Sequence, residues 1–556
     1  MNVIKTAGRL LPTLAILILA GGCGGESDEP AQPGSDPGEP VSGGTVVISE
    51  GADMAIPLLI VAQTSMDGNL GGDVMYMELL RGAWEDRRLV FLTADQSPMA
   101  MARRYEYIGP DSASLRFHMR SDLRWSDGQP ITAADVVYTY EIIGDPDLAS
   151  PQQNYADDLE SVVAENDSTV VFNFTRRYPD MLSHSAMAIL PAHLFANTPT
   201  AEFRNHPAIQ SPENGQLVTS GPYMIGSWER GQTITLVRNP HFQPAAYLDQ
   251  IVFRIIPDPL TRLVELRTGT VDYVNGITLD QVPQLRTEAP HVRIETQEKR
   301  LYDYVAYNPG GFEAFSDPNI RRALSLAIDA PAIIESLEMT EFAVPAGGPY
   351  PPIFPDLYDP QGQAPIAYDP DQARALLTAA GWRDTNNDGI LDRNGQPFRF
   401  TLLTNAGNQR RADVSQILQN QWRQVGVDAQ LQVQEFNTMT ENLSSGDFQA
   451  AVGGWSVGLS PDLTTLWAPD SPYNYTNYTD TEVQELIRRA RTMETSEEAI
   501  PLWRDAASRI AQDQPYTWLY FMDMVHGVNN RVQGTRIDTY GPYQNVWEWW
   551  IPADQQ

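Results

Sequence analysis

A serine in the last fifth of the chain lies in a pattern that serine hydrolases use for their nucleophile. The segment Gly454 to Gly458 reads GWSVG, so Ser456 occupies the centre of G-x-S-x-G. That pattern places a serine on a sharp turn between a strand and a helix. His526 follows downstream, but Pro461 interrupts the expected helix. Hydrolysis by Ser456 therefore stays an alternative, and it requires His526 to reach the serine hydroxyl.

A second stretch, DTNNDGILD, has the spacing of a calcium loop. It places Asp384, Asn386 and Asp388 at positions 1, 3 and 5, followed by a glycine at position 6. Calcium loops of the EF-hand type also need a bidentate glutamate at position 12. Here position 12 is Gly395, and Asp392 at position 9 compensates only in part. Two interpretations remain, an acidic turn or a weak structural calcium site made by these four side chains. We expect no other cofactor.

The only cysteine, Cys23, follows a short apolar run. Lys5 and Arg9 precede residues 10–20, which are almost entirely apolar, and small residues lead into the cysteine. A positive start, a short apolar core and small residues are the parts of a secretory signal. The run is similar to a bacterial lipoprotein signal, which implies that Cys23 is lipidated. An ordinary secretory signal with an incidental cysteine is the alternative.

The segment after the cysteine cannot fold by itself. Residues 24–44 consist almost entirely of Gly, Pro, Ser, Asp and Glu. Such a composition buries too little apolar surface to offset the entropy of ordering. We therefore expect a signal peptide over 1–22, and a lipidated cysteine with a disordered tether over 23–44. The protein is then extracytoplasmic and attached to the membrane by its lipid.

The charge of the chain excludes one class of partner. The formal net charge is −33, and 42% of the residues are hydrophobic. A surface this acidic repels nucleic acid, so we expect no nucleic-acid partner. The residues after the tether, about 510, are enough for one multi-lobed unit or for two to three domains.

Strand and helix signals alternate through the body and indicate a mixed α/β fold. Strands are recognised by alternation and β-branched residues, and helices by apolar periodicity with a cap or a glycine stop. Strands are predicted at 44–50, 114–120, 168–175, 234–240, 248–258 and 427–436. Helices are predicted at 135–143, 370–382, 413–426, 479–493 and 500–514, and a pair of helices at 317–337.

Four segments resemble, in order, the extracytoplasmic solute-binding proteins of the peptide-transport type, which are receptors of ABC importers. They are LRWSDGQPITAADVVYTYE (123–141), TSGPYMIGSWERGQTITLVRNPHF (219–242), FSDPNIRRALSLAIDAPAII (315–334) and AYDPDQARALLTAAGW (367–382). The resemblance implies an α/β, two-lobed periplasmic-binding-protein-like fold of the cluster C type, with an extra domain on lobe 1.

The resemblance also implies a division of the chain. Lobe 1 would comprise residues 45–300 and 525–556, with the extra subdomain at about 88–200, and lobe 2 would comprise 301–524. The chain would cross between the lobes near 292–308 and return near 518–530. Two crossing segments form a hinge, and a ligand favours the closed form by its differential affinity.

The same resemblance points to VGGWSVGLSPD (452–462) as part of the ligand site. In peptide-binding relatives a tryptophan here is followed three residues later by an aspartate, which pairs with the α-ammonium group of the peptide. In this chain Trp455 is followed by Gly458 at that position, and the next acid is Asp462. Either Asp462 substitutes for the aspartate, or the ligand has no free amino terminus there.

Five residues are candidates for ligand contact. Trp455 can stack on a ligand, and the segment around it adds two more candidates. Two further candidates flank the first crossing between the lobes. The set is Tyr304, Asn308, Trp455, Ser456 and Asp462.

The expected function is therefore capture without covalent chemistry. We expect a monomeric substrate-binding lipoprotein, not an enzyme, which delivers an oligopeptide, a dipeptide or a similar polar solute to the permease subunits of an ABC transporter. An oligosaccharide or another non-peptide solute is the alternative ligand. A serine hydrolase and a passive surface adhesin are alternatives of other classes, and an adhesin would have no cavity between lobes.

Overall fold

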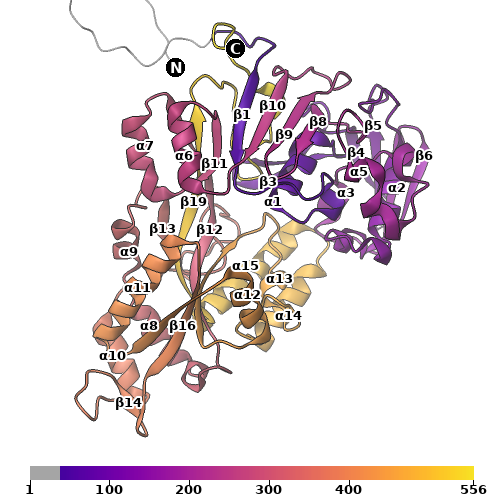
Figure 1. Cartoon of the computed structure of the whole chain (residues 1–556). Coiled ribbons are helices and arrows are strands. Elements are labelled where there is room, and N and C mark those ends of the chain that lie inside the picture. Colours follow the sequence, from indigo (N-terminus) through magenta and orange to yellow (C-terminus); the bar gives the residue numbers. More distant parts are fainter. Residues whose placement is uncertain (1–37, 110) are drawn as a thin grey trace, which may run out of the picture. The chain divides into compact units, whose positions relative to one another are not determined.

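The computed structural model describes residues 38–109 and 111–556, and its body runs from Pro40 to Gln556 (Figure 1). The predictions for Cys23, for the signal peptide and for the tether up to residue 37 lie outside the described residues. Within those residues, no helix is both long and apolar enough to cross a membrane.

One mixed sheet runs through the body. In the part of the chain that is described it has eleven strands, in the order β17-β16-β18-β12-β19-β11-β1-β10-β9-β8, and β13 pairs with β19. The strands are β1 (Thr45–Glu50), β8 (Tyr223–Glu229), β9 (Thr233–Arg238), β10 (Gln250–Ile255), β11 (Tyr273–Ile277), β12 (Val292–Tyr307), β13 (Ala343–Pro345), β16 (Arg399–Asn405), β17 (Asp428–Gln434), β18 (Ala450–Ser456) and β19 (Tyr516–Asn529). The half with β1 and β8–β11 is lobe 1, and the half with β16–β18 is lobe 2.

Strands β12 and β19 belong to both lobes. They pair antiparallel with each other, while β19 also pairs with β11 in lobe 1 and β12 with β18 in lobe 2. Their register shifts between Gln297, opposite Met524, and Leu301, opposite Met522. At this β-bulge β12 uses two residues more than β19 does. The predicted lobe boundaries at 300/301 and 524/525 fall at this irregularity and stay a prediction.

Lobe 1 carries a second, antiparallel sheet within the predicted extra subdomain (Figure 1). Its strands, in spatial order, are β4 (Ala102–Ile108), β5 (Ser114–Met119), β7 (Thr169–Phe174) and β6 (Leu159–Asn166). A separate hairpin is formed by β2 (Arg81–Glu85) and β3 (Arg88–Leu92). The helices of lobe 1 are α1 (Ser65–Gly68), α2 (Ala133–Ile143), α3 (Met181–Ser185), α4 (Ala192–Phe195), α5 (Pro207–Gln210), α6 (Pro259–Thr268) and α7 (Val282–Glu288).

Lobe 2 packs helices on both faces of its part of the main sheet. They are α8 (Pro318–Leu326), α9 (Ala330–Ser336), α10 (Pro370–Ala379), α11 (Gln409–Gln424), α12 (Phe436–Ser445), α13 (Thr464–Trp467), α14 (Thr481–Arg491) and α15 (Ser496–Asp513). A short hairpin is formed by β14 (Asp392–Arg393) and β15 (Gln396–Pro397). Because side chains alternate along a strand, Val305 of β12 lies in the core with α8, α10 and α11, and Tyr304 lies in the core with α12, α14 and α15.

Helix boundaries follow their caps. Thr132 precedes α2 as its N-cap, because its hydroxyl and the Asp135 carboxylate form a capping box. The predicted helix pair over 317–337 is present as α8 and α9, and Asp329 caps the second helix. Helix α11 begins four residues before its predicted start, because Asn408 accepts a hydrogen bond from the Arg411 amide and caps it.

A buried ion pair joins the ends of the chain in lobe 1, and its loss should destabilise the fold. The Asp272 carboxylate is buried, accepts two bonds from Arg531 at 2.6 and 2.7 Å, and accepts a third from the Val47 amide. We expect Asp272→Asn to lower the free energy of unfolding by about 2–4 kcal/mol, measured by urea denaturation at pH 7. Glu485→Gln, which breaks an exposed pair with Arg488, is the control and should cost under about 1 kcal/mol. Equal effects would contradict the prediction.

Candidate functional site

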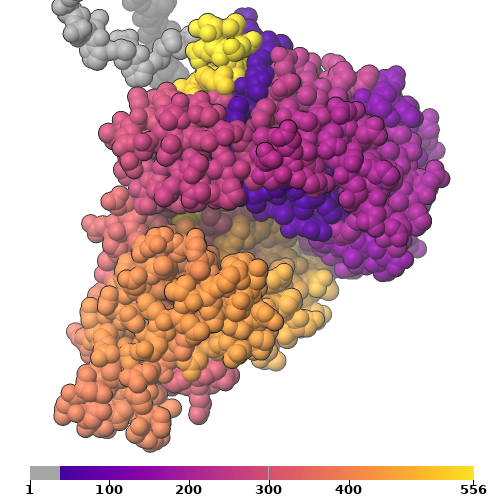
Figure 2. Space-filling model, viewed as in Figure 1, coloured from indigo at the N-terminus to yellow at the C-terminus, as the bar shows by residue number. Residues whose placement is uncertain are grey.

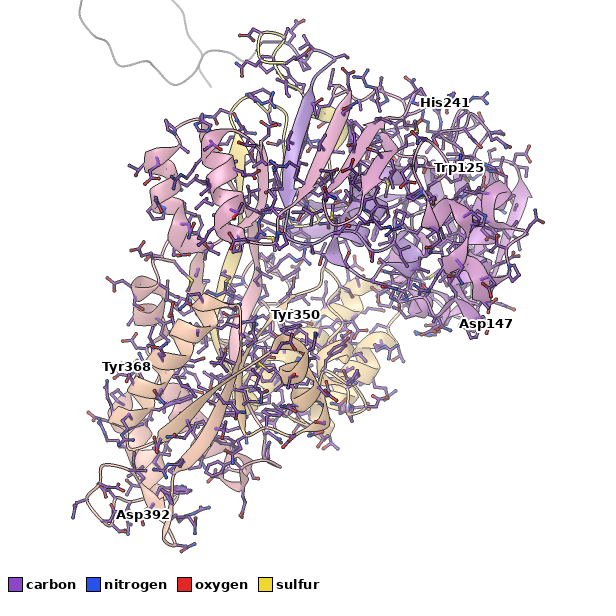
Figure 3. The ribbon with its side chains drawn as sticks, viewed as in Figure 1. Trp125, Asp147, His241, Tyr350, Tyr368 and Asp392 are labelled. Atoms are coloured by element: carbon purple, nitrogen blue, oxygen red, sulfur yellow. The ribbon has the colours of Figure 1, made fainter. Side chains whose placement is uncertain are left out.

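A recess lies between the two lobes. Figure 2 shows the surface hollowed between the indigo and magenta atoms of lobe 1 and the orange atoms of lobe 2. Figure 3 places Tyr350 at the edge of lobe 2 that faces lobe 1. The hydroxyl of Tyr350 donates to the carbonyl of Pro461. The segment that follows β18 therefore lies at this edge of the recess.

Aromatic rings form a continuous stack at the end of β18. Tyr516 and Tyr304 stack with ring centroids 4.1 Å apart, and Trp455 follows at 6.4 Å from Tyr304 and 5.6 Å from Tyr475. Tyr473 meets Trp455 edge-on at 5.6 Å and is 43% exposed. The indole nitrogen of Trp455 is buried and lies beside the Tyr516 side chain. The stack thus ends in a half-buried ring.

Two glycines allow the stack and a charged cluster to lie on opposite faces of β18. A Cβ on Gly453 would lie 2.6 Å from the Tyr304 hydroxyl. A Cβ on Gly454 would lie 2.4 Å from the Asp303 carboxylate. Both distances are shorter than real Cβ contacts, so any larger residue here forces its neighbours apart. Packing on both faces of β18 therefore requires glycine at positions 453 and 454.

The cluster on the other face fixes the end of lobe 2 that borders the recess. Asp303 is fully buried and accepts hydrogen bonds from Arg410 at 3.0 Å, Arg411 at 3.1 Å and the Tyr520 hydroxyl at 2.8 Å. The two arginines hold the pKa of Asp303 below its usual value, although burial opposes them. Arg411 also donates to Asn405 at the end of β16. The cluster thereby joins β12, β16, β19 and the start of α11.

Lobe 1 contacts lobe 2 directly beside the recess. The ring of Trp84 in β2 packs edge-on against Phe354 of lobe 2 at 5.1 Å. Arg88 of β3 forms a bidentate pair with Asp356 at 2.8 and 3.1 Å. On the subdomain side, Arg176 donates to the Arg491 carbonyl at 2.9 Å. The recess is thus bordered by contacts between the lobes.

Acidic groups from both lobes come together at the subdomain contact. The pKa of Asp180 is raised to about 6, first by burial and then by the charge of Asp462, while Arg491 opposes the shift. Nearby, burial lowers the pKa of His184 to about 4. Asp462 itself accepts from the Thr464 amide at 2.7 Å and lies 3.8 Å from Arg491.

Lobe 1 holds a second buried cluster next to its hairpin. Arg81 pairs with Asp73 at 3.0 Å and with Glu78 at 3.4 Å, and all three side chains are buried. Burial raises the pKa of Asp73 to about 6 and that of Glu78 to about 7. The ring of Tyr540, from the C-terminal segment, lies 5.8 Å from the Arg81 guanidinium. The cluster ties the hairpin to the C-terminal segment.

The structure brings some of the five predicted ligand residues together and separates others. Tyr304 and Trp455 stack on each other, and the exposed Ser456 follows Trp455 at the end of β18. Asn308 instead donates to the Gly446 and Phe448 carbonyls and is buried at the far end of β12. Because its amide is committed to backbone, we leave Asn308 out of the site. The Asp462 carboxylate already accepts from the Thr464 amide and pairs with Arg491.

The calcium-loop residues form a turn far from the recess. Asp384 accepts from the Gly389 amide, Asp388 from the Ile390 amide, and Asp392 from Thr385. Figure 3 shows Asp392 at the tip of lobe 2 that points away from lobe 1. No group of three or more His, Cys, Asp or Glu side chains in the described ranges is arranged to hold a metal ion. A calcium site at Asp384, Asn386, Asp388 and Asp392 stays a prediction.

Ser456 and His526 do not form a catalytic pair in this structure. Ser456 pairs with Leu301 of β12, whereas His526 pairs with Glu295 of the same strand. At about 3.3 Å per residue, these positions are roughly 15–20 Å apart along the strand. His526 is buried and shares a hydrogen bond with the Tyr273 hydroxyl. The Ser456–His526 pair that the hydrolase alternative requires is therefore not formed.

Several residues at the recess could not be found by their sequence pattern. Trp84, Tyr350 and Tyr473 come from three distant segments and carry no shared motif. Arg300 lies inside the predicted crossing segment, but no local signal distinguishes it from its neighbours. Only the tertiary structure assembles these side chains.

Comparison with known proteins gives the same fold. The model of the bacterial extracellular solute-binding proteins, family 5 Middle, matches residues 98–477. The oligopeptide-binding protein AppA of Bacillus subtilis (strain 168) is 27% identical over 563 residues, which cover 98% of this chain and 99% of AppA.

Two solved structures superpose on the chain over most of its length. AppA from Bacillus subtilis, in complex with a nonapeptide, is 25% identical with a TM-score of 0.74, covering 92% of this chain and 100% of that one. NikZ from Campylobacter jejuni, in complex with Ni(L-His), is 21% identical with a TM-score of 0.75, covering 91% and 99%. These likenesses confirm the predicted two-lobed α/β fold.

The acidic contact between the lobes should make stability depend on pH. Because the pKa of Asp180 is raised in the folded state, the folded state keeps a proton between about pH 4 and 6 that the unfolded state has lost. Stability therefore falls as the pH rises through this window. We expect Asp180→Asn to be more stable than the wild type by about 1–3 kcal/mol at pH 7.5, and equally stable near pH 3.5, by urea denaturation. The control Asp147→Asn, at an exposed site, should show no such pH-dependent gain, and a pH-independent effect of Asp180→Asn would contradict the prediction.

Proposed function

We propose, because this chain belongs to the family 5 bacterial extracellular solute-binding proteins, that it is the substrate-binding receptor of an ABC importer. It captures an oligopeptide, a dipeptide or a similar polar solute between its lobes and delivers it to permease subunits. It acts outside the cytoplasm, as a monomer, held to the membrane by a lipid on Cys23. Its mechanism is capture and lobe closure without making or breaking covalent bonds.

The observation that carries the proposal is the aromatic stack that ends at the recess between two lobes. The half-buried ring of Trp455 offers an apolar face to a ligand, while its indole nitrogen is buried within lobe 2. Strands β12 and β19 connect the lobes, so a ligand that contacts both lobes favours the closed arrangement. Pockets lined in this way orient a ligand by a few polar groups and hold it by apolar contact.

The charges around Trp455 favour a ligand whose amino terminus is not bound by this loop. Gly458 stands where peptide-binding relatives have an aspartate, and the Asp462 carboxylate is engaged by Thr464 and Arg491. A desolvated ammonium group needs a free anion within hydrogen-bond reach. A peptide held by its backbone and side chains therefore fits best, and a neutral or anionic non-peptide solute is the second candidate.

The first test uses ligand terminus chemistry. We expect a peptide with an acetylated amino terminus to bind within about threefold of the same peptide with a free terminus. The reason is that no carboxylate of the Trp455 loop is free to bind the ammonium group that acetylation removes. Calorimetry with an alanine–serine nonapeptide in both forms measures the difference. A loss of tenfold or more on acetylation would contradict the prediction. Mass spectrometry of ligands that co-purify with residues 44–556 then distinguishes intact peptides from oligosaccharides and from cleaved products.

The second test removes the ring at the end of the stack. We expect Trp455→Ala to weaken ligand binding by about 1–3 kcal/mol, the range for losing a buried aromatic contact. Calorimetry measures the affinity, and thermal unfolding shows that the variant is folded. The control is Tyr368→Ala, a 40% exposed aromatic residue on the outer side of lobe 2 (Figure 3). Unchanged affinity in Trp455→Ala would remove this residue from the ligand site.

A further inference from the structure

Arg300 lies where β12 crosses from lobe 1 to lobe 2. It is the last residue of the bulge between Gln297 and Leu301, and it directly precedes the pairing of Leu301 with Ser456. Residues in a bulge are freed from the regular ladder, so their side chains can point where the strand alone would not place them. Arg300 is therefore free to make contacts that belong to neither lobe alone.

The side chain of Arg300 bonds one carbonyl in each lobe. Its Nε donates to the Val457 carbonyl at 2.9 Å, and Nη1 donates to the Thr539 carbonyl at 2.5 Å. Val457 is the first residue after β18, and its own amide donates to the Arg300 carbonyl at 2.9 Å. Thr539 belongs to the C-terminal segment of lobe 1, which Gln297 also contacts through the Asp538 and Thr539 carbonyls.

The chemistry of the guanidinium suits this position. A planar group with fixed donors can hold two carbonyls at once, whereas an ammonium group would be a single point charge. Burial lowers the pKa of Arg300 and the charge of Asp538 opposes this, but a guanidinium stays protonated near neutral pH. Its bonds to the two carbonyls are therefore charge-assisted and stronger than neutral ones.

The contacts of the C-terminal segment extend the connection into lobe 1. Asp538 accepts from the Tyr540 and Gly541 amides, and the ring of Tyr540 lies beside Arg81. Contacts therefore connect Val457, two residues after Trp455, through Arg300 to the C-terminal segment of lobe 1. That segment in turn contacts Arg81 in the buried charged cluster of lobe 1.

We propose that Arg300 is a positioning residue that couples the order of the segment after Trp455 to the arrangement of the two lobes. The proposal rests on the proposed function, because it makes this segment the ligand-facing one. When both carbonyls are bound, the segment starting at Val457 is fixed and the C-terminal segment of lobe 1 is fixed with it. A rotation of the lobes that separates Val457 from Thr539 breaks one of the two hydrogen bonds of the Arg300 side chain. The segment that loses its bond to Arg300 then becomes more mobile.

The test measures hydrogen exchange of the ligand-free full chain. In Arg300→Met, which keeps the length of the side chain but no donor, we expect the Val457, Tyr540 and Gly541 amides to exchange about tenfold faster, or more, than in the wild type. Arg300→Lys should fall between the two, because it keeps the charge but not the fork. Mass spectrometry of peptides that cover 455–459 and 538–542 provides the readout.

A matched control lies on the same strand. Arg293 donates to the Asn529 carbonyl at 3.1 Å and to Thr535 at 2.6 Å, and it pairs with Glu295, so all of its contacts lie in lobe 1. Arg293→Met should not change exchange in the peptides that cover 455–459. If it changes them as much as Arg300→Met does, or if Arg300→Met leaves them unchanged, the proposal is overturned.

A second measurement separates this proposal from the proposed function. We expect the affinity for an alanine–serine nonapeptide to fall about tenfold in Arg300→Met and to stay unchanged in Arg293→Met. If the wild type does not bind the nonapeptide, peptide binding is contradicted, while the exchange data still decide the role of Arg300. If the wild type binds and both arginine variants lose affinity equally, the coupling is contradicted and the receptor function stands.

Discussion

Strands β12 and β19 pair antiparallel from Val292 opposite Asn529 to Ala306 opposite Tyr516, and both lobes are built outward from this ladder. On the lobe 1 side the ladder continues into β11 and β1, and on the lobe 2 side into β18 and β16. At the crossing, the two lobes are joined by the chain itself and by the backbone hydrogen bonds of the shared strands. Away from the crossing, side chains of the two lobes make contacts such as that of Trp84 with Phe354. The recess between the lobes lies beside this ladder.

The adjacent residues Asp303 and Tyr304, in the part of β12 that belongs to lobe 2, contribute to two different structures. Tyr304 and Trp455 point to one face and present the aromatic stack, while Asp303 points to the other face and binds two arginines and a tyrosine. A fully satisfied buried network rigidifies the strands that carry it. The ring that would meet a ligand is therefore supported from behind by a cluster that never touches it, and Gly453 and Gly454 provide the room for both.

Local signals predicted the body of the fold because they depend on neighbours in the chain. The predicted helices at 135–143 and 317–337 lie next to the caps Thr132 and Asp317, whereas α11 begins four residues before its predicted start because Asn408 caps it. For the ligand site, only the segment around Trp455 carries a motif, and the role of Trp455 stays a prediction. Asn308 flanks the crossing in sequence, but its amide binds the Gly446 and Phe448 carbonyls, and no sequence signal indicates this. Trp84 and Arg300 depend on tertiary pairing, which no local pattern records.

The register of β12 against β19 also bears on how such lobes can diverge. Between Gln297 and Leu301 the first strand has an excess of two residues over its partner. Because side chains alternate with a period of two, this excess leaves inward and outward faces in phase on either side of it. A second shift, between Asp303 and Tyr304, gives β19 one residue more than β12, so the two strands differ by a single residue over the whole ladder. A change in length at either irregularity must therefore keep its parity, or one lobe would turn its core residues outward.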